Sequence, residues 1–497
     1  MKIIFKIKLI CLIGLMLLAV SCKKDFLDLK PTSSLVSGTL TTSQDAENLV
    51  TGAYSKLATN GYFQYGRFFL TEGINDNHYV NGDNPQEWQI ENFSFDASNG
   101  VIGYQDIWSN VAAANAVLSS VPDINDPKWG GTTRKEQILA EASFLRALNY
   151  YELVTQWGGV PIITSLDQGG NYYPSRNTEA EVYAQIIKDL VEAETVLPAT
   201  PYQNQFGRAT KGAAQALLAK TYAQMGDYTN CLLYANKVIS SGTYSLVPDF
   251  GNLWGNTHKN TAESIFEIQV PGGGTPYNFF GFDIFVNSNF QFPKRMIGTK
   301  ALVDAFAASC DTATNKRYRR TINFAYTPAS FNMPVNAWDP TKPIPFMYKY
   351  PDPNGFASDD NIMIMRLADI ILLAAEAHVQ LVKAGGGGSL ATATTLLNQV
   401  RTRAGLPNTT ATTQSDLALA VLNERRLELV FECTRWNDLK RADKNGIVNL
   451  VDIMNNQKNE AGQGLGYSMA ADRHQLIFPI PNQDLLLNKN LTQNPGY

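Results

Sequence analysis

Apolar residues recur every three or four positions in a series of segments along the chain, and these segments come in neighbouring pairs. Such spacing places the apolar side chains on one face of a helix. Glycine or proline follows several of the segments, which predicts helical hairpins with short turns. The expected helices are 105–121, 133–156, 179–197, 211–225, 228–240, 364–384, 390–404 and 415–442.

One of these pairs has the spacing of a tetratricopeptide unit. Leu218, Tyr222, Gly226 and Tyr228 stand at the offsets of that unit, in which small and aromatic residues let two antiparallel helices approach closely. One unit cannot bury its own apolar face, so the other hairpins should stack beside it. The sequence therefore predicts a mainly α fold, a tetratricopeptide-like scaffold of helical hairpins with long loops and minor β pieces.

Long segments rich in glycine, asparagine, proline and aromatic residues separate the hairpins. The two longest are 60–103 and 249–361, and a short strand is expected at 264–270 within the second. Loops of this length within a compact domain usually carry function. A binding site is therefore expected in these two segments.

The N-terminus resembles an export signal. Three lysines precede an apolar run that ends at Val20, and small residues lead to Cys22. The run is shorter than the roughly 20 residues of a comfortable membrane span. A cysteine directly after small residues resembles the lipobox of bacterial lipoproteins, which implies cleavage before Cys22 and lipidation of its thiol and amine. Residues 1–21 are thus predicted to be a lipoprotein-type signal peptide, with an ordinary secreted protein as the alternative.

Charge and composition narrow the classes of ligand. The chain has 41 Lys and Arg against 45 Asp and Glu, and the predicted cleavage removes three of the lysines. An acidic mature chain is poorly suited to nucleic acid. Charged residues make up 17% of the chain, below the usual ~25%, while asparagine, threonine, glutamine and aromatic residues are plentiful. This mixture suits neutral polar ligands such as sugars, although a cell-surface protein can have it without binding them.

Cysteine and histidine offer little further chemistry. Cys231, Cys310 and Cys433 remain after the lipobox, an odd and widely spaced set that does not predict a disulfide framework. The four histidines are scattered without metal-ligand spacing. The sequence has no Gly-x-Ser-x-Gly elbow, phosphate loop or dinucleotide fingerprint. We therefore expect no cofactor, no metal site and no nucleophilic or phosphoryl-transfer activity.

Several stretches, in order along nearly the whole mature chain, resemble the signatures of the SusD/RagB family of outer-membrane lipoproteins. They are 25–28, 140–147 with 158–161, 366–369 with 375–377, 397–407, 424–432 with 435–439, and 478–481 with 492–497. Two positions depart from the pattern: Cys433 stands where the family commonly has glycine, and Asn437 where an aromatic residue is common.

The resemblance implies a SusD-like fold with a particular organisation. A SusD-like N-terminal region of tetratricopeptide-like helices would span 22–230, a RagB/SusD C-terminal region would span 231–497, and the two would form one structural unit. The resemblance also implies a lipid anchor in the outer membrane, with the protein facing the exterior. There it would dock as a lid on a SusC-like TonB-dependent transporter, capture a glycan and hand it to the pore without breaking a bond.

Acidic side chains leave two interpretations open. Every fourth residue from Glu424 to Glu432 is a glutamate, which places these carboxylates on one helical face. Because a buried charge without a partner is costly, we expect ion pairs with Arg366, Arg401 or Arg403. The alternative is a catalytic role, since ion-pair networks and active sites share this pattern.

The first long segment offers further carboxylates and the residues that a sugar needs. A protein binds a sugar with an exposed aromatic ring beside amides and carboxylates. Among the aromatic residues, Trp88, Tyr277 and Trp338 lie amid turn-forming residues and are the preferred platforms, with burial as the alternative for any single ring. The predicted ligand-binding residues are Asp76, Asn77, Tyr79, Trp88, Tyr277 and Trp338.

Two other functions stay open. A peptide-binding lid related to RagB would bind through backbone contacts and show no affinity for carbohydrate. A surface glycoside hydrolase would need two carboxylates placed by the fold across a bond, and would release reducing sugar. Asp76, Asp83, Glu87 and Asp96 lie in one aromatic segment and could supply such a pair.

Overall fold

The computed structural model describes residues 40–81, 84–166, 169–270, 296–324, 338–339, 342–350 and 358–497. The predicted signal peptide, Cys22 and Tyr277 lie outside these residues. Within them, no helix is long and apolar enough to cross a membrane.

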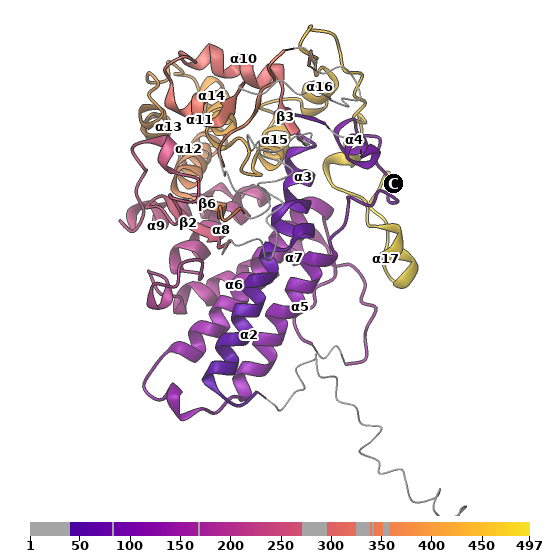
Figure 1. Ribbon diagram of the computed structural model, residues 1–497, viewed down its shortest axis with the longest axis vertical. Helices are drawn as coiled ribbons and strands as arrows, with labels where there is room; N and C mark the ends of the chain where they lie inside the picture. Colours follow the sequence, from indigo (N-terminus) through magenta and orange to yellow (C-terminus); the bar gives the residue numbers. More distant parts are fainter. Residues whose placement is uncertain are drawn as a thin grey trace, which may run out of the picture.

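Helices build most of the described chain (Figure 1), which confirms the prediction of a mainly α fold. The long helices are α2 (Ser43–Ser55), α5 (Gln105–Ser120), α6 (Arg134–Trp157), α7 (Glu179–Val196), α8 (Lys211–Met225), α9 (Tyr228–Ser240), α12 (Leu367–Lys383), α13 (Leu390–Arg403) and α14 (Gln414–Leu429). The short ones are α3 (Gly66–Glu72), α4 (Pro85–Glu91), α10 (Lys300–Ser309), α11 (Lys316–Thr321), α15 (Arg435–Lys444), α16 (Leu450–Asn455) and α17 (Asn482–Leu487).

Helices that follow one another along the chain pack side by side. The closest packing joins α5 to α6, α6 to α7, α8 to α9, and α12 to α13. α12 also packs against α9 and α14, so it links the N-terminal helices to the C-terminal ones. The apolar residues of both regions form one continuous core.

The predicted tetratricopeptide-like unit has the expected geometry. α8 and α9 begin and end at the predicted residues. Gly226 ends α8 in the left-handed conformation, at φ 87°, which glycine adopts without strain. Cys231 is fully buried in α9, and the Tyr222 and Tyr234 rings stack with their centroids 5.7 Å apart. Small and aromatic residues therefore do let these two helices approach closely.

Two predicted helices have different bounds in the structure. Residues Ile362–Arg366 form strand β6, which pairs antiparallel with β2 (Ser264–Ile268), and helix α12 begins after it. Every residue of β6 is buried, and apolar periodicity does not separate a short buried strand from a helix. The segment 415–442 is broken between α14 and α15, where Phe431 and Cys433 have φ of 66° and 57°.

The segment 60–103 is also not the loop that the sequence predicts. It contains α3, strand β1 (His78–Val80) and α4. All seven residues of α3 are buried, including the polar Arg67, Thr71 and Glu72, so this short helix has no exposed face for a polar pattern to mark. The remaining strands are β3 (Met296–Gly298), β4 (Ile322–Asn323) and β5 (Phe346–Met347).

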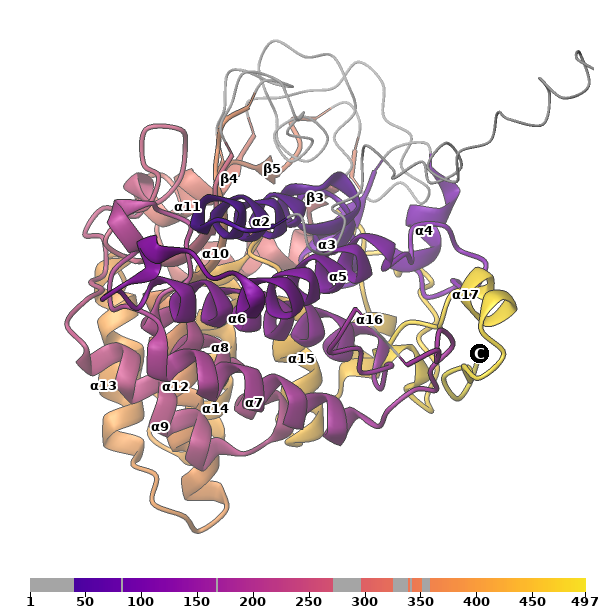
Figure 2. The ribbon, with the colours of Figure 1, turned by 90° about the horizontal axis from the view of Figure 1, so that it is seen from below.

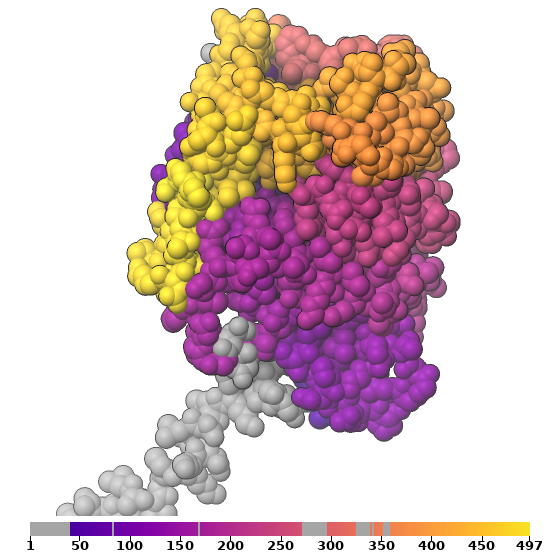
Figure 3. Space-filling view, turned by 180° about the vertical axis from the view of Figure 1, so that it is seen from behind, coloured from indigo at the N-terminus to yellow at the C-terminus, as the bar shows by residue number. Residues whose placement is uncertain are grey.

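The C-terminal residues lie against the N-terminal helices along one flank of the molecule (Figure 3). The Phe478 backbone N–H donates to the Gln156 carbonyl at 2.7 Å. The side chain of Asn494 donates to the carbonyl oxygens of Trp157 and Phe478. The end of the chain thus fixes the C-terminal end of α6.

Candidate functional site

A four-stranded antiparallel sheet, in the order β1-β3-β5-β4, joins the two long segments in which a site was predicted. Tyr79 of β1 pairs with Ile297 of β3, and Ile297 pairs with Phe346 of β5. β1 belongs to the segment 60–103, and the other three strands belong to 249–361. In Figure 2, β3, β4 and β5 lie on one side of the helices, next to α3. Segments far apart in sequence are therefore brought to one face, here called the sheet face.

Trp88 lies on α4, the helix that follows β1. Asn84 caps this helix by accepting from the Gln86 backbone N–H at 3.0 Å, and Pro85 occupies its first turn. Glu87 is buried and accepts hydrogen bonds from the Tyr65 hydroxyl and the Asn84 amide. The Trp88 ring is half-buried against the core, and its indole N–H has no partner among the described residues. Its role in binding stays a prediction.

Asp76 and Asn77 are buried and bind arginines, so the expectation that they are exposed to a ligand is wrong. The Asp76 carboxylate accepts from Arg435 at 2.7 and 2.8 Å, and Asn77 accepts from Arg426 at 2.7 Å. Burial alone would raise the pKa of Asp76, but Arg426 and Arg435 hold it well below its usual value. These side chains anchor the segment before β1 to α14 and α15.

Tyr79 and Trp338 are also buried, at 1% and 7% exposure, so the Trp338 ring is not the exposed platform that the sequence predicts, and Tyr79 is not exposed to a ligand. The Tyr79 hydroxyl donates to the Lys458 carbonyl and accepts from the Lys300 backbone N–H at 3.2 Å. The Trp338 indole donates to the Pro343 carbonyl at 3.2 Å. Each polar tip is thus used within the protein, and both rings belong to the core.

Polar groups that the sequence did not indicate lie next to Trp338. The Glu460 carboxylate accepts from the Asp339 backbone N–H and from the Lys342 ammonium, both at 2.9 Å. Asp339 and Lys342 keep 36% and 57% of their side chains exposed. Partly exposed carboxylate and ammonium groups such as these can hydrogen-bond to hydroxyl groups of a ligand. Glu460 comes from a segment 121 residues away from Asp339, and no local pattern marks it.

Glu91, at the end of α4, gives this region a pH-dependent stability. Its surface is 4% exposed, and it accepts a hydrogen bond from the Tyr467 hydroxyl. Burial raises the pKa of Glu91 to about 8, against an ordinary value of 4.5. The folded state therefore holds a proton that the unfolded chain releases. The contribution of Glu91 to the free energy of unfolding is fully present below pH 4.5 and is lost as the pH rises through about 8.

We expect Glu91→Gln to reduce this pH dependence. Glutamine keeps an acceptor for Tyr467 but does not titrate, so the variant should gain ~2 kcal/mol or more on the wild type between about pH 5 and about pH 8. Chemical denaturation across this range measures the difference. Glu136→Gln, at an exposed glutamate of α6, is the control and should follow the wild type. Parallel curves for wild type and E91Q would contradict the prediction.

The glutamates of α14 form the predicted ion pairs, in a buried network of several arginines. Arg366 binds Glu263, Glu428 and Glu432, each at 2.7 Å. Arg403 binds Glu263 at 2.6 Å and also contacts Glu428, while Arg401 binds Glu424 at 2.9 Å; Arg317 and Lys349 complete the network. Burial alone would raise the pKa of Glu428, but the arginines hold it well below its usual value. A carboxylate kept ionised in this way cannot serve as a proton donor, so the geometry favours the structural interpretation over the catalytic one.

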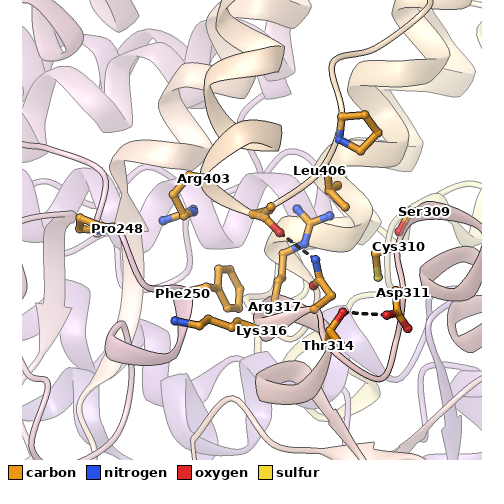
Figure 4. Close-up of a pocket in the computed structure, with 14 residues that line it drawn as sticks. Pro248, Phe250, Ser309, Cys310, Asp311, Thr314, Lys316, Arg317, Arg403 and Leu406 are labelled. Carbon is orange, nitrogen blue, oxygen red and sulfur yellow. Dashed lines mark hydrogen bonds between the residues drawn. The ribbon is translucent and has the colours of Figure 1, made fainter.

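A cavity of about 330 Å³ lies beside this network (Figure 4). Arg317 and Arg403 stand at its wall, and both are engaged by the buried glutamates. The Asn315 amide donates to the Ala404 carbonyl at 2.8 Å. The Thr314 hydroxyl donates to Asp311, also at 2.8 Å, and Figure 4 shows this bond. Most of the polar groups that line this cavity thus already bind other groups of the protein. In the described part of the chain, no group of three or more histidine, cysteine or acidic side chains could hold a metal ion.

Comparison with known proteins gives consistent matches along the chain. The family described as "SusD family" matches residues 293–497, and the family described as "Starch-binding associating with outer membrane" matches residues 25–223. The chain is 27% identical to "SusD-like protein P2" of Formosa agariphila, over 92% of this chain and 93% of that protein. It is 25% identical to "Starch-binding protein SusD" of Bacteroides thetaiotaomicron, over 72% of each.

The fold is similar to that of solved structures. One is "Surface glycan-binding protein A from Bacteroides thetaiotaomicron in complex with laminarihexaose", with a TM-score of 0.72 and 20% sequence identity. The alignment covers 91% of this chain and 100% of that one. At this identity the likeness concerns the fold, and it matches the SusD-like fold that the sequence predicts.

Proposed function

Because the chain belongs to the SusD/RagB family, we propose that it captures a glycan at the outer membrane without cleaving it. The family description "Starch-binding associating with outer membrane" and the starch-binding relative support glycan binding. We place the binding site at the sheet face, because the sheet joins strands from both aromatic-rich segments and its strand β1 contacts α4, which carries the half-buried Trp88. Sugar hydroxyls could hydrogen-bond to the polar groups beside Trp338, which belong to Asp339, Lys342 and Glu460.

The proposal extends to anchoring and delivery. Lipid on Cys22 would hold the protein at the outer membrane, facing the exterior, while the polypeptide stays in water. The captured glycan would pass to a SusC-like TonB-dependent transporter, on which the protein sits as a lid. Co-purification of such a barrel with the wild-type protein from solubilised outer membranes tests the delivery step.

A carbohydrate array with neutral plant, algal, host and microbial polysaccharides tests the binding step. We expect at least one polysaccharide to bind, and Trp88→Ala to weaken that binding about tenfold, which is ~1.4 kcal/mol for the loss of one aromatic contact. Tyr173→Ala removes a ring that is 56% exposed on a different loop and should bind like the wild type. Thermal melts of all three proteins check that they fold.

The array also separates the alternatives. No signal on any polysaccharide, together with binding to a peptide library, would replace the proposal with a peptide-binding lid. Release of reducing ends from a bound polysaccharide would replace it with a glycoside hydrolase. Of the carboxylates in the first segment, Asp76 is bound by arginines, and Glu87 accepts bonds from Tyr65 and Asn84. These bonds argue against a catalytic pair that includes Asp76 or Glu87.

A further inference from the structure

A second cavity lies at the N-terminal ends of α2 and α6. Its volume is about 490 Å³, within the ~300–1,000 Å³ range of small-molecule sites. In Figure 1, α2 rises from this end of the molecule toward α3, and β3 lies near the opposite end. The cavity is therefore separate from the sheet face. Its walls come from the start of α2, from the short helical turns Pro127–Trp129 and Tyr202–Asn204, and from the first turns of α6.

Two aromatic rings border this cavity, and both are partly exposed. The Tyr202 ring lies over the guanidinium of Arg134, 3.8 Å from the ring centroid. Its hydroxyl makes no hydrogen bond to any described residue. Trp129 packs its ring against the core, and its indole N–H is buried without a partner in the described chain. The Tyr202 hydroxyl is therefore the polar tip that a ligand in the cavity can reach, and the Trp129 ring offers an apolar surface.

The floor under Tyr202 is rigid and electrically balanced. Arg134 donates to Glu47 at 2.5 and 3.0 Å and to Glu141 at 2.6 Å. Arg208 reaches the same two carboxylates, at 2.9 and 3.0 Å. Two arginines therefore neutralise two glutamates, so the floor attracts neither anions nor cations strongly. A neutral ligand suits this balanced floor, and the exposed Lys128 at the wall adds an ammonium group that can donate to a hydroxyl.

The turn that carries Tyr202 is held in an unusual backbone conformation. Gln203 and Asn204 have φ of 47° and 58°, in the left-handed region that side chains other than glycine rarely adopt. Backbone hydrogen bonds from Asn204 to Pro201 and from Gln205 to Tyr202 close the turn. Such strain persists only where the surroundings enforce it, and it concentrates at binding sites. The ring of Tyr202 is thus fixed before any ligand arrives.

Besides Lys128, several uncharged hydrogen-bonding groups lie around the rings. Gln44, Gln137 and Thr133 line the same cavity. The Gln137 amide donates one hydrogen bond, to Thr133 at 3.2 Å, so its carbonyl oxygen and second N–H are free to bind a ligand. Flat rings beside amides and hydroxyls suit a molecule with apolar C–H faces and a rim of hydroxyl groups.

We propose that this cavity is a second site for a neutral sugar unit, so that a long glycan contacts the protein both here and at the sheet face. The inference rests on the proposed glycan binding, and it specifies the place at which a second sugar unit binds. α6 alone is about 36 Å long at 1.5 Å per residue, so a short oligosaccharide occupies one site at a time. A polysaccharide that reaches both gains affinity because its second contact is intramolecular.

Isothermal titration calorimetry with laminarin, soluble starch and the hexasaccharide of each tests this site. With the glucan that binds, we expect two hexasaccharides per wild-type molecule and one per molecule of Trp129→Ala or Tyr202→Ala. Each variant should also bind the polysaccharide at least tenfold more weakly. The control Tyr173→Ala should match the wild type in both readouts. Gln137→Ala, which removes the free amide alone, keeps the test informative if a ring variant does not fold.

The outcomes separate this inference from the proposed function. One hexasaccharide per wild-type molecule, with W129A and Y202A unchanged, overturns the second site and leaves glycan capture at the sheet face intact. Loss of one site in Trp88→Ala and of the other in Trp129→Ala supports both. No binding to either glucan, together with no signal on the carbohydrate array, overturns the proposed function and the second site together.

Discussion

Replacing Arg366 by alanine is expected to lower the free energy of unfolding by about 3–5 kcal/mol, or to prevent stable folding. The side chain is fully buried, and its guanidinium binds Glu263, Glu428 and Glu432. Without it, carboxylates that are almost completely hidden from water lose their shared counter-charge. An uncompensated buried charge costs several kcal/mol, far more than an exposed pair contributes.

Arg401→Ala is the matched control for this prediction. Arg401 belongs to the same network, but 19% of its side chain is exposed and it binds one carboxylate, Glu424, at 2.9 Å. Its removal should cost about 1 kcal/mol or less. Urea denaturation followed by circular dichroism measures both variants. Equal effects of the two substitutions would mean that burial does not decide the strength of these pairs.

Asp76→Ala is expected to have the second largest effect, again about 3–5 kcal/mol of lost stability. The variant leaves the buried Arg435, 5% exposed, and the largely covered Arg426, 13% exposed, without the carboxylate that both contact. Because these arginines hold the pKa of Asp76 below its usual value, the stabilisation is present at neutral pH and is lost as the pH falls below about 4. Wild type and variant should therefore converge in acid.

The control for Asp76 is another aspartate of the same segment. Asp96 is exposed and bonds locally to Ser98, at 2.7 and 2.5 Å, so Asp96→Ala should change stability by about 0.5 kcal/mol or less. Denaturation at neutral and acidic pH compares the two variants. If Asp76→Ala weakened glycan binding but left the unfolding midpoint unchanged, Asp76 would be a ligand residue after all, as its sequence context suggested.

The sequence predicts most of the scaffold because most helices are amphipathic and end at glycine or proline. Tyr228–Ser240 shows this best, because its buried residues recur every three or four positions and it was predicted with its final bounds. Lys211–Met225 is buried over most of its length, and Gly226 marked its end instead. The pattern fails where a segment is buried on all sides. Gly66–Glu72 is a short helix whose polar residues are buried with its apolar ones, and the apolar residues of Ile362–Arg366 suit a strand and a helix equally.

The site was harder to predict because burial depends on partners that are distant in sequence. Asp76 meets Arg435 across 359 positions, and Tyr79 meets Lys458 across 379. Neither contact leaves a local signal in the sequence. Asp76 and Tyr79 were therefore predicted to bind a ligand, although both are buried. Trp129 and Tyr202 were missed for the converse reason. Each lies in a short turn without an aromatic neighbour in sequence, and only the fold brings the two turns to one cavity.

Capture without cleavage is measured most directly by recovering the ligand after binding. The purified protein is incubated with the polysaccharide that the array selects, the complex is isolated, and the chain length and reducing ends of the released glycan are determined. We predict micromolar or tighter binding and a glycan of unchanged length, since a lid that delivers cargo must not alter it. Shortened chains with new reducing ends, or a protein that retains no glycan at all, would contradict the account.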